Sequence, residues 1–563
     1  MDRLAGEGDL PRLVALILAN RGITEPGDAA RFLSSSLADL HDPFLMQGME
    51  KAVSRLAKAV ADGETLCVYG DYDVDGITST VLLTEFFRSI GLSSLYHIPL
   101  RLEEGYGLSE EGIRSVADRG ARVIISVDCG ITSVNEAHLC RSLGIDLIIT
   151  DHHMPGDEIP PAFAVINPLQ PGCPFPFKHL AGVGVAFNLM IALRTRLREE
   201  GRFAANREPN LREYLDLVAL GTVADIVPLV DENRVFVKYG LGELSASKRT
   251  GIQALKDVAG VRGEVTCGAV GFRLAPRLNA AGRLEDAALG VELLLCRDRQ
   301  RAEVMAAELD AGNAERQALE QSILEDALAM VMGNSALKKR RSIVLASESW
   351  HPGVIGIVAS RMVDIFHRPT ILIALNEGNG RGSGRSIPAF HLHDALRACS
   401  EHLVKFGGHR HAAGLSIEQS TLESFVARFD EVAGGLLSPE DLVPELSVDL
   451  VLKPGDVDCG LAEAIAKLAP FGMGNPEPVF VMEGARVEDK RVLKGRHLKL
   501  RLAAGGKYLD AIGFNMADRE DLPDHIDVAF SLEANEWNGR KNVQLKLREF
   551  KKADGKQLED ACM

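Results

Sequence analysis

The sequence has few of the features that would place a protein in a membrane or in an oxidising compartment. Its 563 residues include nine cysteines, an odd number, and no two of them form a C-x-x-C pair. This argues against a disulfide framework and against a thiolate zinc site. No apolar run approaches the roughly 20 residues that a membrane-spanning helix needs, and the N-terminus does not have the pattern of a signal peptide. We therefore expect a cytoplasmic protein with no membrane attachment.

Other absences bear on the ligands. The sequence contains no GxxxxGK[ST] motif, so nothing in it predicts ATP binding or hydrolysis. Lysine and arginine total 63 against 79 aspartates and glutamates, a net charge of −16. Such a balance argues against nucleic-acid binding through overall charge, although it leaves room for a local basic groove. Aromatic residues make up only 5% of the chain, so a bound nucleic acid would be held mainly by its backbone, with a strong salt dependence.

The first feature that is present is an alternating α/β pattern. Compact apolar runs rich in β-branched residues occupy 65–70, 121–128 and 146–150, and amphipathic segments separate them. This pattern predicts a parallel sheet with helices on both faces. The three runs end at Asp71, Asp128 and Asp151. Because ligands of open α/β sheets bind beyond the carboxyl ends of the strands, we expect the chemistry at this edge.

The rest of the chain changes character several times. A proline-free stretch rich in Ala, Leu, Glu and Arg predicts a long helix, and a second α/β unit follows it. The C-terminal part alternates apolar and polar residues, with Asn538-Gly539 as a hairpin signal. The predicted fold class is α/β, with two α/β domains joined by a long helix and a C-terminal β-barrel. The predicted boundaries are an N-terminal helical segment 1–50, a first α/β domain 51–282, a helical connector 283–335, a second α/β domain 336–440, a β-barrel domain 441–553 and a tail 554–563.

The acidic residues at the strand ends predict a metal site. Asp73 and Asp75 are two residues apart in a loop, and their like charges repel unless a cation lies between them. Asp225 stands within an apolar run, where an unpaired carboxylate would be costly. Carboxylates together with the imidazoles of His152 and His153 suit Mn²⁺ or Mg²⁺ better than structural zinc. There are enough such ligands for two cations, the arrangement that activates water for attack on phosphorus.

Each of these motifs has a simpler interpretation when it is taken alone. An Asp-Gly dipeptide is most often a turn, and the acid in Asp151-His152-His153 would most often be a helix N-cap. Asp225 by itself would be an ordinary residue at a helix end. The metal site is favoured because the acids end three strands and occur together with a histidine pair and an acid in an apolar run.

The chain closely resembles a known superfamily in these segments. "GDYDVDG" (70–76), "SVDCG" (126–130), "TDHHMPG" (150–156) and "ALGTVADIVPL" (219–229) are similar, in order, to the four motifs of the DHH phosphoesterases. "RLNAAGRL" (277–284), "WHPGVIGIVASR" (350–361), "GSGRS" (382–386) and "GGHRHAAG" (407–414) resemble further motifs of the RecJ family, including its DHHA1 domain. The β domain resembles the OB-fold of that family. The resemblance covers nearly the whole chain and implies a single-strand-specific exonuclease that degrades DNA from the 5′ end in recombination and repair.

The resemblance also implies roles for individual residues. Asp73 and Asp75 would each bind one of two cations, Mn²⁺ or Mg²⁺, and Asp128 would bridge them. The remaining members of the site would be His152 and Asp225 as further ligands, His153 facing the scissile phosphate, Asp151 orienting the histidines, and Asp71 as a ligand or the support of one. Many superfamily members carry a histidine four residues before the acid that matches Asp73. This sequence has Tyr69 there, so we expect the ligand set of the first metal to differ.

Several segments are candidates for holding the substrate. "RGSGRS" combines glycines, which free the backbone to approach phosphate, with arginines and hydroxyls that bind phosphate oxygens. Taken alone, this stretch would be a flexible polar loop and "GGHRHAAG" a tight turn. A basic strand near residue 495 would usually be a solvated face, although on an OB-like barrel it is a candidate groove for a single strand. The candidate phosphate or nucleic-acid contacts are Arg101, Arg277, Arg283, Arg381, Ser383, Arg385, Ser386, His409, His411, Lys494, Arg496 and Lys499.

The sequence leads to one main hypothesis and two alternatives. We predict a two-metal 5′-to-3′ exonuclease on single-stranded DNA that acts as a monomer. Its expected partners are a helicase and a single-strand-binding protein. The strand would enter a cleft between the two α/β domains. The first alternative is a DHH phosphodiesterase on short oligonucleotides or cyclic dinucleotides. The second is a non-catalytic DHH protein that binds single-stranded DNA or a helicase, which the presence of all motif acids disfavours.

Overall fold

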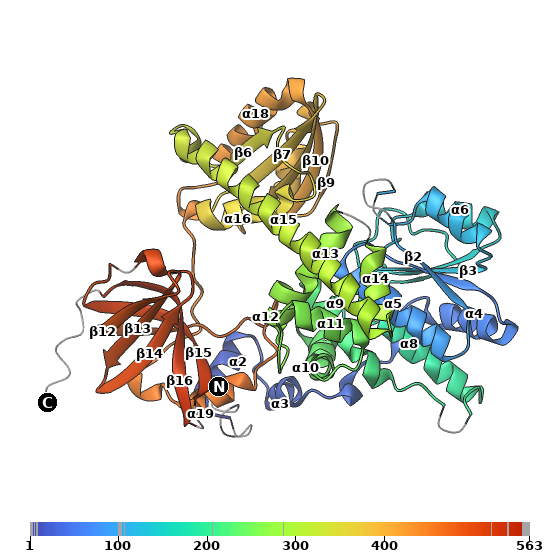
Figure 1. Ribbon diagram of the computed structural model, residues 1–563, viewed down its shortest axis with the longest axis horizontal. Coiled ribbons are helices and arrows are strands. Elements are labelled where there is room, and N and C mark those ends of the chain that lie inside the picture. The colour runs from blue at the N-terminus through green and yellow to red at the C-terminus, as the bar shows by residue number, and fades with distance from the viewer. Residues whose placement is uncertain are drawn as a thin grey trace.

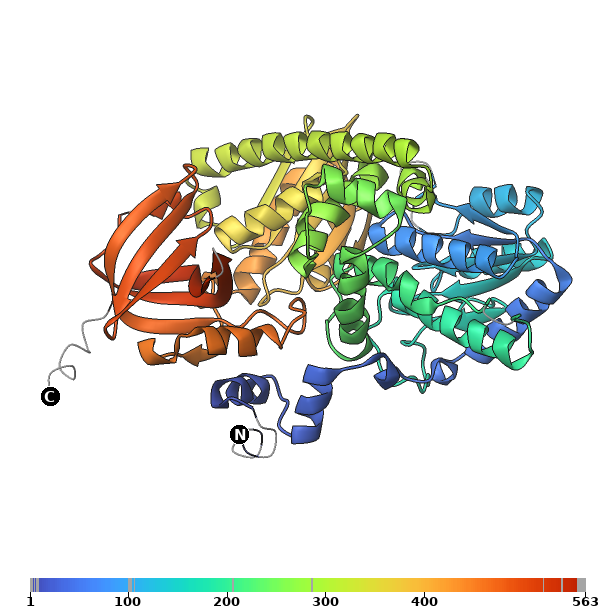
Figure 2. The same ribbon diagram turned by 60° about the horizontal axis from the view of Figure 1, so that its bottom comes forward.

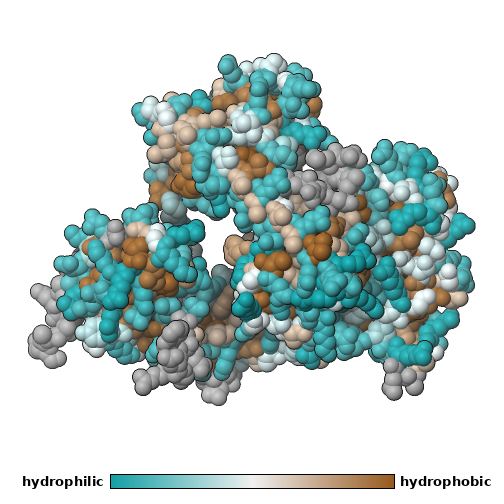
Figure 3. Space-filling model, in the orientation of Figure 1, coloured by the Kyte–Doolittle hydropathy of each residue, from teal (hydrophilic) through white to brown (hydrophobic). Residues whose placement is uncertain are grey.

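The computed structural model describes residues 10–99, 104–105, 107–204, 207–284, 287–519, 521–537 and 540–553, together with Leu4 and Gly6. Three sheets form three bodies, which helices and short linkers connect (Figure 1). The space-filling view shows an opening that passes between the three bodies (Figure 3). Among the described residues, no helix combines the length and the apolar character needed to cross a bilayer.

The first body contains the predicted parallel sheet. Its strand order is β2-β1-β3-β4-β5, and every pairing is parallel. The central strands are buried along their whole length, because apolar helices cover both faces, with α5 and α8 on one side and α6 and α7 on the other. The elements are β1 (Leu66–Tyr69), β2 (Ser94–His97), β3 (Val123–Val127), β4 (Asp146–Thr150), β5 (Ala164–Ile166), α4 (Met49–Asp62), α5 (Val74–Ser89), α6 (Glu110–Asp118), α7 (Val134–Ser142) and α8 (Gly182–Glu199).

Helices complete the first body and lead to the second. They are α9 (Leu215–Ala224), α10 (Asp231–Ser245), α11 (Thr250–Val258), α12 (Cys267–Ala269), a π-helical turn η4 (Val270–Leu274), α13 (Ala275–Leu284) and α14 (Ala288–Leu295). The predicted connector is the 35-residue helix α15 (Arg299–Gly333), which runs from the first body to the second (Figure 2). It begins where the side chain of Asp298 accepts a hydrogen bond from the backbone N–H of Arg301.

The second body is a five-stranded mixed sheet with helices packed on it. Its order is β6-β7-β8-β10-β9, in which only the β6–β7 pair is parallel. An apolar core lies between the sheet and helix α18, and a second cluster joins α15 and α16 to the other face. The elements are β6 (Ile343–Ser347), α16 (Ile355–Phe366), β7 (Thr370–Asn376), β8 (Asn379–Arg385), α17 (Leu392–Arg397), β9 (Lys405–Gly408), β10 (Ala412–Glu418) and α18 (Leu422–Leu436).

The third body is the predicted β-barrel. Its strands follow the order β12-β13-β14-β16-β15, and β15 also pairs with β12, which closes the barrel. Asn538-Gly539, where the sequence predicts a hairpin turn, lies outside the described residues, and the flanking residues Trp537 and Arg540 are paired between β15 and β16. The elements are β11 (Leu450–Val451), α19 (Cys459–Ala466), β12 (Phe480–Leu493), β13 (His497–Ala504), β14 (Lys507–Gly513), β15 (His525–Trp537) and β16 (Arg540–Lys552). Helices α2 (Arg12–Asn20) and α3 (Pro26–Ser34) share the apolar core of this barrel, so the N-terminal segment packs on the C-terminal body.

Candidate metal centre

The loop after β1 places two acids at the start of α5. Asp73 is the N-cap of this helix, and its Oδ1 accepts hydrogen bonds from the backbone N–H groups of Asp75 (2.9 Å) and Gly76 (3.0 Å). Gly76 has no room for a side chain, because a Cβ there would lie 2.5 Å from the carbonyl oxygen of Asp71. The backbone thus fixes Asp71, Asp73 and Asp75 within one tight turn.

A second helix begins against these acids. The two carboxylate oxygens of Asp75 accept hydrogen bonds from the N–H groups of Gly182 (2.6 Å) and Val183 (2.8 Å), at the first turn of α8. The positive end of the helix dipole favours the charged carboxylate there. A Cβ on Gly182 would lie 2.7 Å from both Cβ and Oδ1 of Asp128. Glycine at this position therefore lets Asp128, at the end of β3, approach the same point.

Carboxylates and imidazoles converge into three overlapping clusters. In each cluster the candidate ligand atoms lie within 4.8 Å of one another. His152 is central, since its Nε2 lies 3.0 Å from Oδ1 of Asp128, 3.6 Å from Oδ2 of Asp225 and 4.0 Å from Oδ2 of Asp75. The three clusters are Asp71-Asp73-Asp128, Asp75-His152-Asp225 and Asp128-His152-His153.

The clusters fit divalent cations. His152 Nε2 and Asp225 Oδ2 are buried and find no hydrogen-bond partner among the described residues, which is rare for polar atoms in folded proteins. Oxygen and imidazole donors without a thiolate match Mn²⁺ or Mg²⁺. A cation between these atoms would satisfy them and offset the repulsion among the carboxylates.

The pKa values of these groups reflect the crowding of negative charge. Burial and the charge of Asp73 raise the pKa of Asp75 to about 7, and burial with the charges of Asp75 and Asp73 raises the pKa of Asp225 to about 9. The same causes raise the pKa of Asp128 well above its usual range. Burial and the neighbouring His153 lower the pKa of His152 to about 4, so this imidazole is neutral near pH 7 and its lone pair is available to a metal.

Asp151 and His153 form a separate pair beside the cluster. Oδ1 of Asp151 lies 2.8 Å from Nδ1 of His153, and it also accepts the backbone N–H groups of His152 and His153. Burial alone would raise the pKa of Asp151, but the hydrogen bond from His153 lowers it. Burial opposes the charged form of His153, whereas its bond to Asp151 outweighs this and raises the pKa of the imidazole. The His153 side chain is 42% exposed, against 11% for His152.

Tyr69, where many superfamily members carry histidine, is engaged elsewhere. Its hydroxyl lies 3.2 Å from Oγ of Ser109 and accepts the backbone N–H of that residue, which is the N-cap of α6. Its ring lies against the ring of His97, at 4.6 Å between centroids. His97 and Ser109 both contact the carboxylate of Glu104. The Tyr69 hydroxyl therefore anchors the start of α6.

The glycine-rich segment in the second body corrects one expectation. It is the strand β8 and not a loop with a free backbone. Its alternate glycines face the core, where a Cβ on Gly382 would lie 2.6 Å from Leu415 and one on Gly384 would lie 2.9 Å from Leu392. Glycine is needed here so that Leu415 and Leu392 can pack closely on β8. The local sequence of β8 does not show this requirement, because these two leucines belong to other elements.

The other face of β8 carries the predicted polar residues Arg381, Ser383 and Arg385. The first turn of α16 lies directly above them, since a Cβ on Gly356 would be 2.8 Å from Oγ of Ser383 and 3.2 Å from a guanidinium nitrogen of Arg385. Burial lowers the pKa of Arg385, which donates to Oγ of Ser383 at 3.2 Å. A helix N-terminus, a guanidinium and a hydroxyl together suit a phosphate group.

The remaining predicted contacts lie in different surroundings. His409 and His411 are exposed in the turn between β9 and β10, and the turn meets the end of β8 through the bond from Ser386 N–H to the His411 carbonyl. The hydroxyl of Ser386 donates to the carbonyl of Phe390. The guanidinium of Arg277 is held by the carboxylate of Asp310 on α15. Arg101 lies outside the described residues, as does the side chain of Arg283.

The barrel carries a basic surface that sequence reasoning located only in part. The turn between β12 and β13 carries Lys494 and Arg496, which are both exposed, and β13 carries Lys499. Sequence reasoning missed Tyr508, which is 62% exposed under the guanidinium of Arg501 at 4.8 Å. It also missed Phe514, 47% exposed, because β-barrel aromatics alternate between core and surface and only the register separates them. The second and third strands of an OB-fold are its usual oligonucleotide face.

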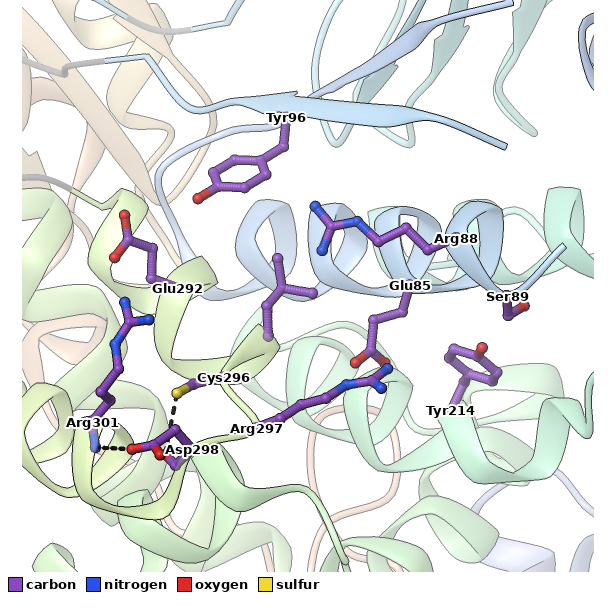
Figure 4. A pocket seen from close by; sticks show the side chains of 11 residues that line it. Glu85, Arg88, Ser89, Tyr96, Tyr214, Glu292, Cys296, Arg297, Asp298 and Arg301 are labelled. Atoms are coloured by element: carbon purple, nitrogen blue, oxygen red, sulfur yellow. Dashed lines mark hydrogen bonds between the residues drawn. The ribbon is translucent and has the colours of Figure 1, made fainter. Parts of the chain in front are cut away.

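A cavity of about 1030 Å³ lies at the opposite end of α5 from the metal cluster (Figure 4). The C-terminal turn of α5 contributes Glu85, Arg88 and Ser89, and the junction of α14 with α15 contributes Arg297 and other charged side chains. Glu85 is ion-paired with Arg249. None of the residues predicted for the metal site lines this cavity.

Three family profiles match the chain in order. They are described as the DHH family, N-terminal domain (residues 65–222), the DHHA1 domain (residues 340–435) and the RecJ OB domain (residues 448–549). Each coincides with one of the three sheets described above.

Curated relatives and solved structures match over most of the chain. The chain is 42% identical to the single-stranded-DNA-specific exonuclease RecJ of Escherichia coli over 95% of both chains. It is 41% identical to the protein of that name from Bacillus subtilis, over 95% of this chain and 67% of the relative. The crystal structure of RecJ from Thermus thermophilus with Mn²⁺ superposes with a TM-score of 0.82 at 33% identity, covering 98% of this chain and 77% of that one. Its structure with Mg²⁺ gives a TM-score of 0.77.

Proposed function

This chain belongs to the RecJ family of single-stranded-DNA-specific exonucleases, and we propose from that premise how its residues carry out the reaction. The chain is a metal-dependent exonuclease that hydrolyses phosphodiester bonds in single-stranded DNA. We further propose that it degrades the strand in the 5′-to-3′ direction and serves DNA recombination and repair.

The observation that carries the mechanism is the division of the ligand clusters. Asp73 falls in one cluster and Asp75 in another. Asp128 belongs to the first and lies 3.0 Å from His152, the centre of the second. This supports two cation sites, one held by Asp71, Asp73 and Asp128 and the other by Asp75, His152 and Asp225, with Asp128 shared between them.

The residues around the two sites would divide the work of hydrolysis. Divalent cations held there would supply a water of lowered pKa and would neutralise charge on the scissile phosphate. Asp151 fixes His153 through Nδ1 and raises its pKa. The other ring nitrogen of His153 can therefore carry a proton and donate it to a phosphate oxygen. Asp75 is held in place by the first turn of α8.

Two surfaces are suited to holding the strand away from the bond that breaks. Ser383 and Arg385, under the first turn of α16, would bind the phosphate at the 5′ end, with Arg381, His409 and His411 at the rim. Lys494, Arg496 and Lys499 with Tyr508 on the barrel would bind the strand further along, through its phosphates and by stacking. The opening between the three bodies would be the path of the strand (Figure 3).

The proposal also covers the partner proteins, the oligomeric state and the cellular compartment. The chain has no GxxxxGK[ST] motif, so we propose that a helicase separates the duplex strands and that a single-strand-binding protein presents them. We propose that the enzyme works as a monomer in the cytoplasm.

One digestion tests the mechanism and the direction. Single strands with a 5′ phosphate and a label at either end are incubated with Mn²⁺, with Mg²⁺ or with EDTA. We expect metal-dependent release of the 5′ label first, and release of the 3′ label first would refute the direction. Asp128→Ala should abolish activity and lower the metal content, whereas Asp118→Ala, an exposed acid at the end of α6, should leave both unchanged. Full activity of Asp128→Ala would refute the shared ligand.

A further inference from the structure

One aromatic side chain stands on the surface of the first body where a solvated residue would be expected. Phe272 is 85% exposed, more than any other large apolar side chain among the described residues. Burial of a phenylalanine stabilises a protein relative to leaving it exposed, so folding alone does not favour this placement. Single apolar side chains are common on protein surfaces, so exposure alone does not indicate a ligand. The backbone and the surface around Phe272 decide between a ligand-binding residue and an isolated surface residue.

The backbone around Phe272 imposes this exposure. The residue lies in the π-helical turn Val270–Leu274, between α12 and α13. Val270 and Leu274 are fully buried, and they anchor both ends of the turn while the residue between them points outward. Single π-helical turns inside helices are rare and often occur at functional sites.

The surface beside the ring is open. A Cβ built on the neighbouring Gly271 would meet no heavy atom within 4 Å, and one on Gly268 would meet only Thr266 Oγ1, at 3.8 Å. No side chain of these neighbours would stand in the way of a flat ligand on the ring. Arg273, which is exposed, adds positive charge to the same helical segment.

The turn is connected rigidly to the metal loop. Helix α13 continues from it without a break, and the side chain of Asn279 on α13 accepts the backbone N–H of Val74 at 3.1 Å. Gly282 of the same helix touches the loop too, since a Cβ there would lie 2.6 Å from the carbonyl oxygen of Tyr72. Asn279 follows Phe272 by seven positions, which is on the order of 10 Å along a helix. Helix α12, labelled in Figure 1, lies beside the opening that Figure 3 shows in the same orientation.

We propose that Phe272 is a stacking platform for a base of the single strand, a short distance from the metal centre. The inference rests on the proposed function and names a positioning residue for it. Every base has a π-face, so stacking on a phenyl ring tolerates any sequence. In a duplex each base is already stacked and paired, and it cannot lie on the ring. Phe272 therefore contributes to the preference for single strands as well as to affinity.

The test compares Phe272→Ala with Phe272→Trp, and Val304→Ala, 68% exposed on α15, is the matched control. Alanine should weaken binding of a long single strand in EDTA by on the order of tenfold, because base–aromatic stacking is worth about 1–3 kcal/mol. Tryptophan should preserve binding, and its fluorescence should be quenched by the strand. Hydrolysis of a 5′-phosphorylated dinucleotide should be unchanged in all variants, and so should the melting temperature.

A second comparison separates stacking from a structural role. The affinities of the wild type and of Phe272→Ala are measured for strands that carry one abasic position. One abasic position should weaken wild-type binding and have no effect on the variant, because the base and the ring contribute one shared interaction. Equal affinity of wild type and Phe272→Ala for the intact strand would overturn the platform. Failure of the wild type to degrade single strands at all would instead overturn the proposed function.

Discussion

Arg234 should control how the barrel is held on the catalytic body. The residue lies on α10 and is only 2% exposed. Its guanidinium donates to three carbonyl oxygens at 2.9 Å each, those of Phe32, Leu468 and Ala469, and it stacks on the Phe32 ring at 3.8 Å. One side chain thus joins the first body to the N-terminal helices and to the segment that leads into the barrel. Burial lowers its pKa to about 10, so it remains charged near pH 7.

Arg234→Met removes all five donors and keeps a side chain of similar length. Three carbonyls lose their partner, and each unsatisfied buried acceptor costs about 1–3 kcal/mol. Because water reaches part of an opened interface, we take the lower end of this range, which gives about 3 kcal/mol. Docking of the barrel would then weaken by roughly 100-fold. The loss should fall on the interface between bodies, since the core of each body is unchanged.

Three measurements check this prediction. Calorimetry should show the barrel unfolding as a separate transition, small-angle scattering should show a larger radius of gyration, and proteases should cleave between residues 437 and 449 faster. Affinity for long single strands should fall while dinucleotide hydrolysis persists. Arg198→Met removes an exposed ion pair with Glu208 and should change none of these. An Arg234→Met variant with wild-type scattering and strand affinity would show that other contacts hold the barrel.

Three further predictions concern the metal centre. Gly182→Ala should abolish metal-dependent cleavage, since its Cβ would lie 2.7 Å from Oδ1 of Asp128. The control Gly242→Ala, whose Cβ would meet no heavy atom within 4 Å, should keep full activity and the wild-type metal content. Tyr69→Phe removes the hydroxyl that anchors α6, so it should lower the melting temperature and leave the Mn²⁺ affinity unchanged. Weaker Mn²⁺ binding at an unchanged melting temperature would instead make the hydroxyl a metal ligand. The raised pKa of Asp75, about 7, means that a cation displaces its proton, so calorimetric Mn²⁺ affinity should fall up to about tenfold per pH unit below that value. Without metal the folded state holds this proton more tightly than the unfolded state, so stability should fall as pH rises from about 4 to about 7, and a flat or rising profile would contradict the assignment.

The sequence could predict the catalytic sheet and its acids because both are local features. Apolar runs that end in Asp71, Asp128 and Asp151 define buried strands and the edge at which they finish. Parallel strands bring their carboxyl ends together whatever the details of packing. The convergence of Asp75 with His152 therefore followed from the order of the motifs, and the structure supplies the distances.

Contacts between distant segments could not be predicted in this way. The hydroxyl of Tyr69 is used by Ser109, 40 residues away, and the glycines of β8 are required by Leu415 and Leu392 on other elements. Phe272 has no sequence signal of its own, because only the burial of its neighbours shows that its ring faces solvent.

The sequence by itself determined the ligand types, the strand ends on which they lie and the order of the domains. These depend on residue chemistry and on a hydrophobic pattern that one segment carries alone. Only the tertiary structure decided that Arg234 meets Leu468 and that the N-terminal helices share a core with the barrel. Those pairings are set by the packing of whole elements across the chain, and neither partner's local sequence records the other.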